Sequence, residues 1–147
     1  MVSVFDIVKY ILSKQKSVTA MKLQKLVYYC QVWSIVWDGK ALFKGKIEAW
    51  ANGPVVRELY CSHRGKYEIN SITGGDVKIL EDYQKETIDS VLEFYGDKTS
   101  QWLSDLTHME KPWREAREGI ADGERGDREI THSSMEEYYT SISPIKN

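Results

Sequence analysis

The longest hydrophobic stretch of the chain lies between Ala20 and Asp38, and its apolar residues recur at helical spacing. They form two adjacent stripes, one of Leu23, Leu26, Val27, Cys30, Trp33 and Trp37, the other of Tyr28, Val32, Ile35 and Val36. A helix that is apolar nearly all round must be surrounded by protein, so we predict a central core helix. Charged residues in its first turns, Lys22 and Lys25, exclude a membrane span.

Shorter segments with one apolar face predict further helices around this one. Capping residues place their starts near Ser3 or Asp6, at Ser17 or Thr19 for the core helix, and at Thr99 or Ser100. Gly39 is predicted to end the core helix in the left-handed conformation. The predicted helices lie at residues 4–16, 80–95, 100–109 with Trp102, Leu103, Leu106 and Met109 facing inward, 112–118, and from Ser133 or Ser134 onward.

Apolar and polar residues alternate over residues 42–51, which predicts a strand or short hairpin near Lys46–Trp50. Asn52-Gly53-Pro54 is predicted as a turn, with Pro54 at the first position of a helix that continues through Val55, Val56, Leu59 and Tyr60. A second strand is expected within residues 67–72. The predicted fold class is α+β, predominantly α-helical, with a central buried helix, short surrounding helices and a small antiparallel sheet. We expect a single domain over residues 1–147, with a loop near 122–130 and a frayed tail from about 143.

Composition and charge are those of a folded soluble domain, with 41% hydrophobic and 29% charged residues. The net charge of −2 conceals an asymmetry. Residues 1–66 hold eleven Lys and Arg against four Asp and Glu, whereas residues 67–147 hold nine against eighteen. Such halves either pair internally or leave the molecule bipolar, able to steer a charged partner.

The two cysteines, Cys30 and Cys61, and the lack of a signal-peptide pattern at the start favour a reduced, cytoplasmic protein. Cys61 and His63 are two residues apart on a predicted helix, so they point to different faces and form a poor nucleophile–base pair. The candidate metal ligands lack the spacing of known zinc motifs: Cys61, His63, His108, Glu110 and His132. No phosphate-binding glycine motif is present either. The sequence therefore predicts no catalytic site, metal or cofactor.

Nucleic acid is a weaker alternative. The two N-terminal helices could mimic a helix-turn-helix, and lysines lie nearby at Lys22, Lys25, Lys40, Lys44 and Lys46. The second of these helices is filled with Leu, Val, Tyr and Trp, however, whereas a recognition helix needs an exposed polar face.

Three segments in the same order and separation resemble the Panacea domain, the SocA-like antitoxin family: KLQKLVYYCQVW, IEAWANGPVVRELY and LTHMEKPWREAR. The resemblance covers roughly Val4 to Ile142. It implies a cytosolic, mostly helical protein encoded beside a toxin gene, often in a prophage or mobile element, which neutralises the protein toxin by direct binding. One branch of the family instead delivers its toxin to an AAA+ protease, and a DNA-binding autoregulator is a further alternative. With no membrane span and no catalytic motif in the residues, we expect neither a membrane partner nor enzymatic activity.

The residues of these segments are interpreted mainly as structural. Trp50 and Trp113 are large enough to tie elements together, and His108 could donate or accept a hydrogen bond across to another segment. The predicted structural signature is Leu23, Leu26, Tyr29, Gly53, Pro54, His108, Pro112 and Trp113.

Aromatic and cationic residues that flank these segments are the predicted contacts to a partner, since aromatic and Arg side chains dominate interface energetics. We expect them to be exposed and to lie along the strand-to-helix segment. They are Trp37, Lys46, Trp50, Arg57, Tyr60, His63 and Arg64.

Overall fold

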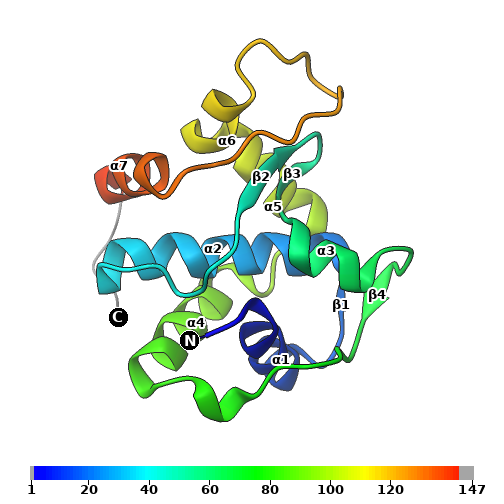
Figure 1. The fold of residues 1–147 in the computed structure, drawn as a ribbon, viewed down its shortest axis with the longest axis vertical. Coiled ribbons are helices and arrows are strands. Elements are labelled where there is room, and N and C mark those ends of the chain that lie inside the picture. The colour runs from blue at the N-terminus through cyan, green and yellow to red at the C-terminus, as the bar shows by residue number, and fades with distance from the viewer. Residues whose placement is uncertain (1, 143–147) are drawn as a thin grey trace.

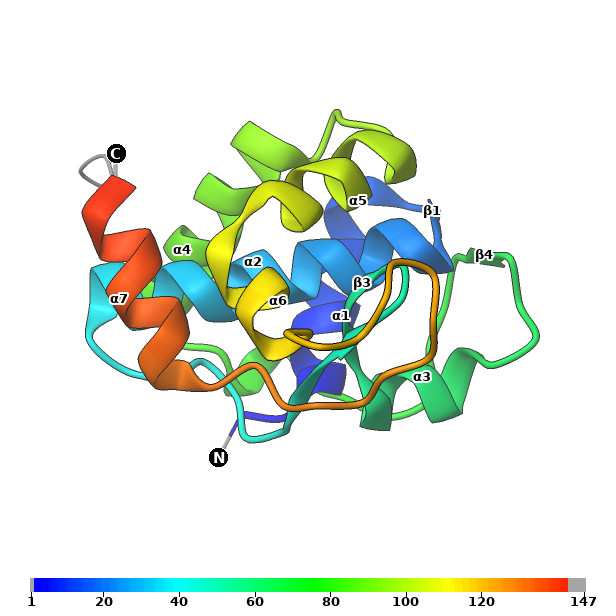
Figure 2. The same ribbon diagram turned by 90° about the horizontal axis from the view of Figure 1, so that it is seen from above.

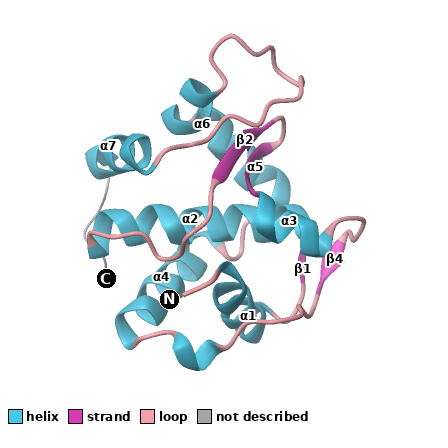
Figure 3. Ribbon diagram, viewed as in Figure 1, coloured by secondary structure: helices cyan, strands magenta, loops and turns pink. Residues whose placement is uncertain are grey.

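The computed structural model describes residues 2–142, and the predicted tail from about 143 lies outside them. The described helices are α1 (Val4–Gln15), α2 (Ala20–Asp38), α3 (Arg57–His63), α4 (Asp82–Tyr95), α5 (Ser100–Met109), α6 (Lys111–Ala116) and α7 (His132–Ile142), with a short 3-10 helix η1 (Val77–Ile79). The strands are β1 (Val18–Thr19), β2 (Ile47–Trp50), β3 (Gly53–Val56) and β4 (Glu68–Ile69). The predicted predominance of helix is confirmed, but the strands form two small antiparallel sheets instead of one (Figure 3).

Helix α2 runs through the middle of the molecule, in contact with α1, α3, α4, α5, α7 and strand β3 (Figures 1 and 2). Its side chains are buried without interruption from Leu23 to Ile35, which confirms the predicted core helix. The Thr19 hydroxyl accepts a hydrogen bond from the Lys22 N–H, and Gly39 ends the helix at φ +73°, both as predicted. None of the helices within residues 2–142 is long and apolar enough to span a membrane.

In helix α5, the hydrophobic pattern predicts the direction of some side chains correctly and of others wrongly. Leu103 is fully buried and Leu106 packs partly against the core, as predicted. The inward orientation predicted for Trp102 and Met109 is wrong, because these side chains are 42% and 65% exposed. At 3.6 residues per turn, each lies roughly 100° or more around the helix from Leu103, on the flank of the buried face.

Strands β2 and β3 form a hairpin, with Ile47 opposite Val56 and Trp50 opposite Gly53. The predicted helix start at Pro54 is therefore wrong, since Gly53–Val56 is a strand and α3 begins at Arg57. A side chain of α2 explains the extended backbone. The Gln24 amide accepts from the Val56 N–H (2.8 Å) and donates to the Val56 carbonyl (3.3 Å), so both polar groups of Val56 are used outside any helix.

The second sheet pairs β1 with β4, two strands that lie far apart along the chain. Val18 pairs with Ile69, and Thr19 pairs with Glu68. The connection between α1 and α2 thus contains a two-residue strand, and the strand expected within residues 67–72 is reduced to Glu68–Ile69. This pairing fixes the end of the α3–β4 connection against the start of α2.

Residues 122–130, the segment of the predicted loop, have irregular backbone and lie along the edge of β2 that does not face β3. The Ala49 N–H donates to the Arg128 carbonyl, and the Ile130 N–H donates to the Ile47 carbonyl, both at 2.8 Å. The buried Arg117 guanidinium fixes the loop's beginning by donating to the carbonyls of Ala49, Ala121 and Glu124. Helix α7 follows and packs against α2.

Candidate functional site

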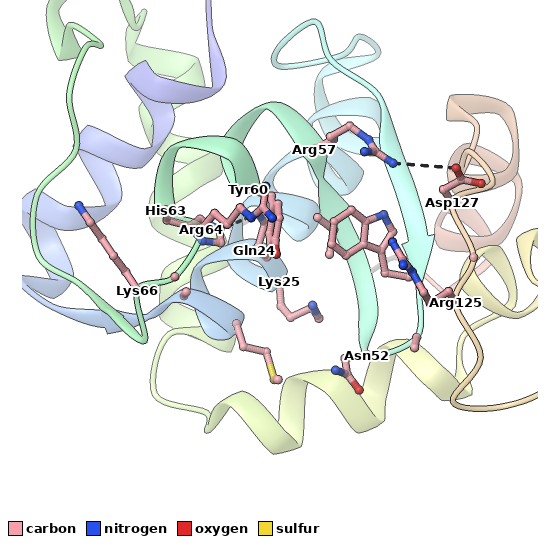
Figure 4. Close-up of a pocket in the computed structure, with 17 residues that line it drawn as sticks. Gln24, Lys25, Asn52, Arg57, Tyr60, His63, Arg64, Lys66, Arg125 and Asp127 are labelled. Atoms are coloured by element: carbon pink, nitrogen blue, oxygen red, sulfur yellow. Dashed lines mark hydrogen bonds and ion pairs between the residues drawn. The ribbon is translucent and has the colours of Figure 1, made fainter.

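The described part of the molecule has a surface hollow of about 700 Å³, which we call the basin (Figure 4). It lies between the first turns of α2, the β2–β3 hairpin, helix α3 and the loop segment 125–127. Three stretches of the chain that are distant in sequence, 20–25, 50–66 and 125–127, therefore build one site.

The floor of the basin holds Lys25, whose side chain is 1% exposed although it ends in an ammonium group. Its Nζ donates to the Pro54 carbonyl at 3.1 Å. Burial lowers the pKa of Lys25 to about 7, because the charged form is deprived of water. This amine is the most perturbed cationic group of the site.

Gly53 provides the space for this lysine. Its φ of +121° suits only glycine well, and an added Cβ would lie 2.5 Å from Lys25 Cε. The sequence predicted that the Gly53-Pro54 pair starts a helix, but the pair has a different role in the structure. It lets the hairpin backbone pass directly over a buried side chain.

His63 closes the basin beside α2, and it is buried at 6% exposure, so the prediction of an exposed contact residue is wrong. The Gln24 oxygen is used by the Val56 N–H, so its Nε2 is the donor to His63 Nε2, 2.9 Å away. Burial lowers the pKa of His63, and the charge of Lys25 lowers it further. A neutral His63 that accepts from Gln24 is thus the stable form.

The upper wall is a cluster of Trp50, Arg57 and Tyr60 held by Glu48. Arg57 donates to both Glu48 oxygens (2.9 Å from Nη2 to Oε1, 3.1 Å from Nε to Oε2), and Trp50 Nε1 donates to Oε1 (2.8 Å). Burial acts to raise the pKa of Glu48, but the bonds from Arg57 and Trp50 outweigh it and lower this pKa. The Arg57 guanidinium lies 5.6 Å from the centre of the Trp50 ring, and Tyr60 meets that ring edge-on. The wall is thus a pre-ordered aromatic and cationic surface.

Five of the seven predicted contact residues line the basin: Trp50, Arg57, Tyr60, His63 and Arg64. Lys46 is exposed just before β2 and lies outside the lining. Trp37 is at the opposite end of α2, half-buried, with its ring stacked on Trp33 at 5.0 Å. The structure thus separates Trp37 from the other predicted contacts.

The residues of the predicted structural signature are mostly buried in the elements that carry the basin. Leu23, Leu26 and Tyr29 are fully buried in α2, and Pro112 is buried at the start of α6. Trp113 Nε1 donates to the Trp50 carbonyl at 2.9 Å, which ties α6 to the hairpin as the sequence suggested.

His108 behaves differently from the prediction of a hydrogen bond across segments. Its ring stacks on Trp113, with centres 4.0 Å apart, and its buried Nε2 has no hydrogen-bond partner among the described residues. Burial lowers the pKa of His108, and the nearby Lys25 charge lowers it further. The contact that His108 makes is therefore aromatic stacking within its own segment, between α5 and α6.

Lys25 and Arg125 are among the site residues that the sequence alone did not identify. Lys25 was counted among the polar residues at the start of the core helix, although it shares a face with Tyr28, Tyr29 and Val32 at helical spacing. A lysine on the apolar face of a core helix is unusual, and this position could have indicated a buried functional amine. Arg125 lies in the loop, far along the chain from the other basin residues, and no local pattern indicates its position.

Cysteine and metal chemistry find little support in the described residues. Cys30 is buried in α2, where burial raises the pKa of its thiol, and Cys61 is exposed on α3, so both are free. Within residues 2–142, no group of three or more His, Cys, Asp or Glu is arranged to hold a metal ion.

Comparison with known proteins identifies the family. The model of the antitoxin SocA-like Panacea domain matches residues 23–114, which is more than half of the chain and includes α2, the hairpin, α3, α4 and α5. Searches of curated proteins and of solved structures give no match. The matched segment contains the floor and the upper wall of the basin, and the chain therefore belongs to the SocA-like antitoxin, Panacea domain family.

Proposed function

We propose that this protein is a cytoplasmic antitoxin that neutralises a cognate protein toxin, encoded by a neighbouring gene, by binding it directly. The family match carries this proposal. Neutralisation by binding requires no catalysed reaction, only a surface that covers the active region of the toxin. An interface of ordinary size would bury about 1,200–2,000 Å².

The basin wall is our candidate for the centre of that interface. Trp, Tyr and Arg are the residues that most often supply binding energy at the centre of interfaces. Here Trp50 and Tyr60 are partly exposed, and the Arg57 side chain is 54% exposed. Because Glu48 already orders Arg57 and Trp50, these side chains lose little conformational freedom on binding.

The burial of α2 argues against the alternative of a DNA-binding autoregulator that reads bases with this helix. From Leu23 to Ile35 its side chains are covered by the rest of the fold, so they are inaccessible to a groove of DNA. The lysine most central to the supposed basic flank, Lys25, is itself buried.

Co-expression with the protein of the adjacent gene tests the proposal. We expect the neighbour to arrest growth alone, and to be rescued by this chain and purified with it near one to one. Rescue without a stable complex, accompanied by loss of the neighbour, would indicate delivery to an AAA+ protease instead. A neighbour that is not toxic and forms no complex would contradict the proposal.

The contact surface is tested separately by the Trp50→Ala and Arg57→Ala variants. If they lie at the interface centre, each weakens the complex by about 2 kcal/mol, or roughly thirtyfold in dissociation constant. The matched controls are Phe94→Ala on α4 and Lys78→Ala in η1, an exposed aromatic and an exposed cation outside the basin. Unchanged affinity in both basin variants would remove this surface from the proposal and leave the antitoxin function standing.

A further inference from the structure

The basin carries an excess of positive charge. Among the described lining residues, Asp127 is the only acid. Five lining residues are cationic: Lys25, Arg57, Arg64, Lys66 and Arg125. Glu48 pairs with Arg57 at 2.9 Å, and Asp127 lies 3.9 Å from the same guanidinium. Within residues 2–142, Arg64, Lys66 and Arg125 have no ion-pair partner. The compensated arginine therefore belongs to the wall. Arg64, Lys66 and Arg125 leave the basin positive, and Lys25 adds its charge when it is protonated, below a pH of about 7.

The buried Lys25 gives this charge a centre. An ammonium group has three N–H donors, and the described residues supply it with one acceptor, the Pro54 carbonyl. Its side chain extends from α2 to the floor of the basin, and in the view of Figure 4 it lies between Arg64, which follows α3, and Arg125 of the loop. A group with several acceptor oxygens would therefore meet donors from three separate segments.

The size of the basin indicates the kind of molecule that would enter. Pockets for small molecules commonly enclose about 300–1,000 Å³, and the basin encloses about 700 Å³. A phosphate group brings close to two negative charges and three strong acceptor oxygens, which suit arginine forks and a lysine together. A carboxylate brings one charge and two oxygens, so it would use fewer of these donors.

We propose that the basin binds a phosphorylated small molecule, with its phosphate held by Lys25, Arg64 and Arg125 and its organic part against the rings of Trp50 and Tyr60. The proposal goes beyond toxin neutralisation and does not depend on it, because the isolated chain is sufficient for the test.

Isothermal titration calorimetry of the full chain in about 50 mM salt provides this test, with four probes. Pyrophosphate and adenosine triphosphate carry the proposed group, adenosine carries a ring without it, and succinate carries carboxylates. We expect one-to-one binding of the two phosphorylated probes, with adenosine and succinate at least tenfold weaker. The affinity for pyrophosphate should also fall with added salt.

Two double variants with the same change in charge separate a site from general attraction. Arg64→Gln with Arg125→Gln removes two exposed basin cations, and Lys78→Gln with Lys111→Gln removes two exposed cations elsewhere. We expect the first pair to weaken binding of the phosphorylated probes at least tenfold, and the second less than twofold. Lys25→Met should abolish binding, but the first pair decides the test even if that variant does not fold.

Three results would overturn the proposal. Absence of binding by both phosphorylated probes would do so, as would an equal loss in the two double variants. Binding of succinate as tightly as pyrophosphate would assign the basin to carboxylates, such as an acidic side chain of a partner protein, and would reject the phosphate.

Discussion

Gln31 in the second half of α2 and Lys25 in the first half are both buried polar side chains, but their hydrogen bonds are completed to different degrees. In the second half, the Gln31 amide accepts from the Leu42 and Phe43 N–H groups (2.7 and 3.2 Å) and donates to the Phe43 carbonyl (2.9 Å). In the first half, Lys25 has a single acceptor among the described residues, and it borders the basin.

Glu110 is a second buried polar side chain whose hydrogen bonds are complete, like those of Gln31. It is buried beneath α2, and its Oε1 accepts from the hydroxyls of Tyr29 (2.6 Å) and Tyr139 (2.7 Å), with Tyr28 and Tyr139 3.0 Å apart through their oxygens. A polar group with its hydrogen bonds complete fixes the packing of α2 against α7. A polar group with donors to spare, at the edge of a hollow, is available to a ligand. The comparison therefore separates a structural half of the helix from the half that carries Lys25, which we call the binding half. Gln24 in that half has its hydrogen bonds complete and supports the basin.

The largest expected effect comes from breaking the complete arrangement at Gln31. Gln31→Leu would leave three buried backbone groups of residues 42 and 43 without their partner, at a cost of about 3 kcal/mol in the free energy of unfolding. Urea denaturation measures this loss. The control is Gln101→Leu on the exposed face of α5, expected to change stability by about 0.5 kcal/mol or less. Equal losses in the two variants would contradict the structural assignment of this half.

Glu110 offers a graded test of the same half. Glu110→Ala removes the acceptor of two buried tyrosine hydroxyls and should cost about 2 kcal/mol, whereas Glu110→Gln keeps an acceptor oxygen and should cost less than about 1 kcal/mol. Burial raises the pKa of Glu110. The stability of the natural protein relative to Glu110→Gln should therefore fall as the pH rises above the ordinary carboxyl pKa. Denaturation midpoints across the acidic range test both statements, and equal losses in the two variants would contradict them.

The binding half is predicted to respond to pH in the opposite direction. Burial lowers the pKa of Lys25 from 10.5 to about 7, so between these values the unfolded chain binds a proton that the folded chain releases. The free energy of unfolding should therefore rise by about 1.5 kcal/mol between about pH 7 and 8.5. His63 and His108, the other groups near Lys25, have lowered pKa values and titrate below this range.

The matched variant for this pH effect is Lys25→Met, which keeps an unbranched side chain one atom shorter and removes the amine. The rise in stability with pH should be missing in Lys25→Met, as measured by denaturation at several pH values. The same rise in both proteins would show that another group causes it, and the distinction between the two halves would lose its electrostatic basis.

Much of this fold follows from local patterns. The continuous apolar character of α2, the Thr19 cap and Gly39 predict the central helix and its ends, because each depends on neighbours within one or two turns. The strand at 47–50 likewise follows from alternation. The error at Pro54 has a tertiary cause: the Gln24 amide, 32 residues away from Val56, makes the backbone extended where the local sequence favours a helix.

The candidate site was predictable only in part, for the same reason. Trp50, Arg57 and Tyr60 lie close in sequence and so could be grouped without a structure. The basin also needs Lys25 from α2 and Arg125 from the loop, which only the tertiary packing brings to that segment. His63 was misjudged because its partner, Gln24, lies 39 residues away.

The loop that completes the basin is secured at both ends. Arg117 holds its beginning through backbone carbonyls, and the pairing of Glu129 with Glu48 on β2 holds its end. Arg125 and Asp127 lie between these two attachments, outside the segment matched by the family model. Substitutions there alter one wall of the basin at little cost to the core. Natural variation can therefore change what this surface recognises while the scaffold beneath it stays the same.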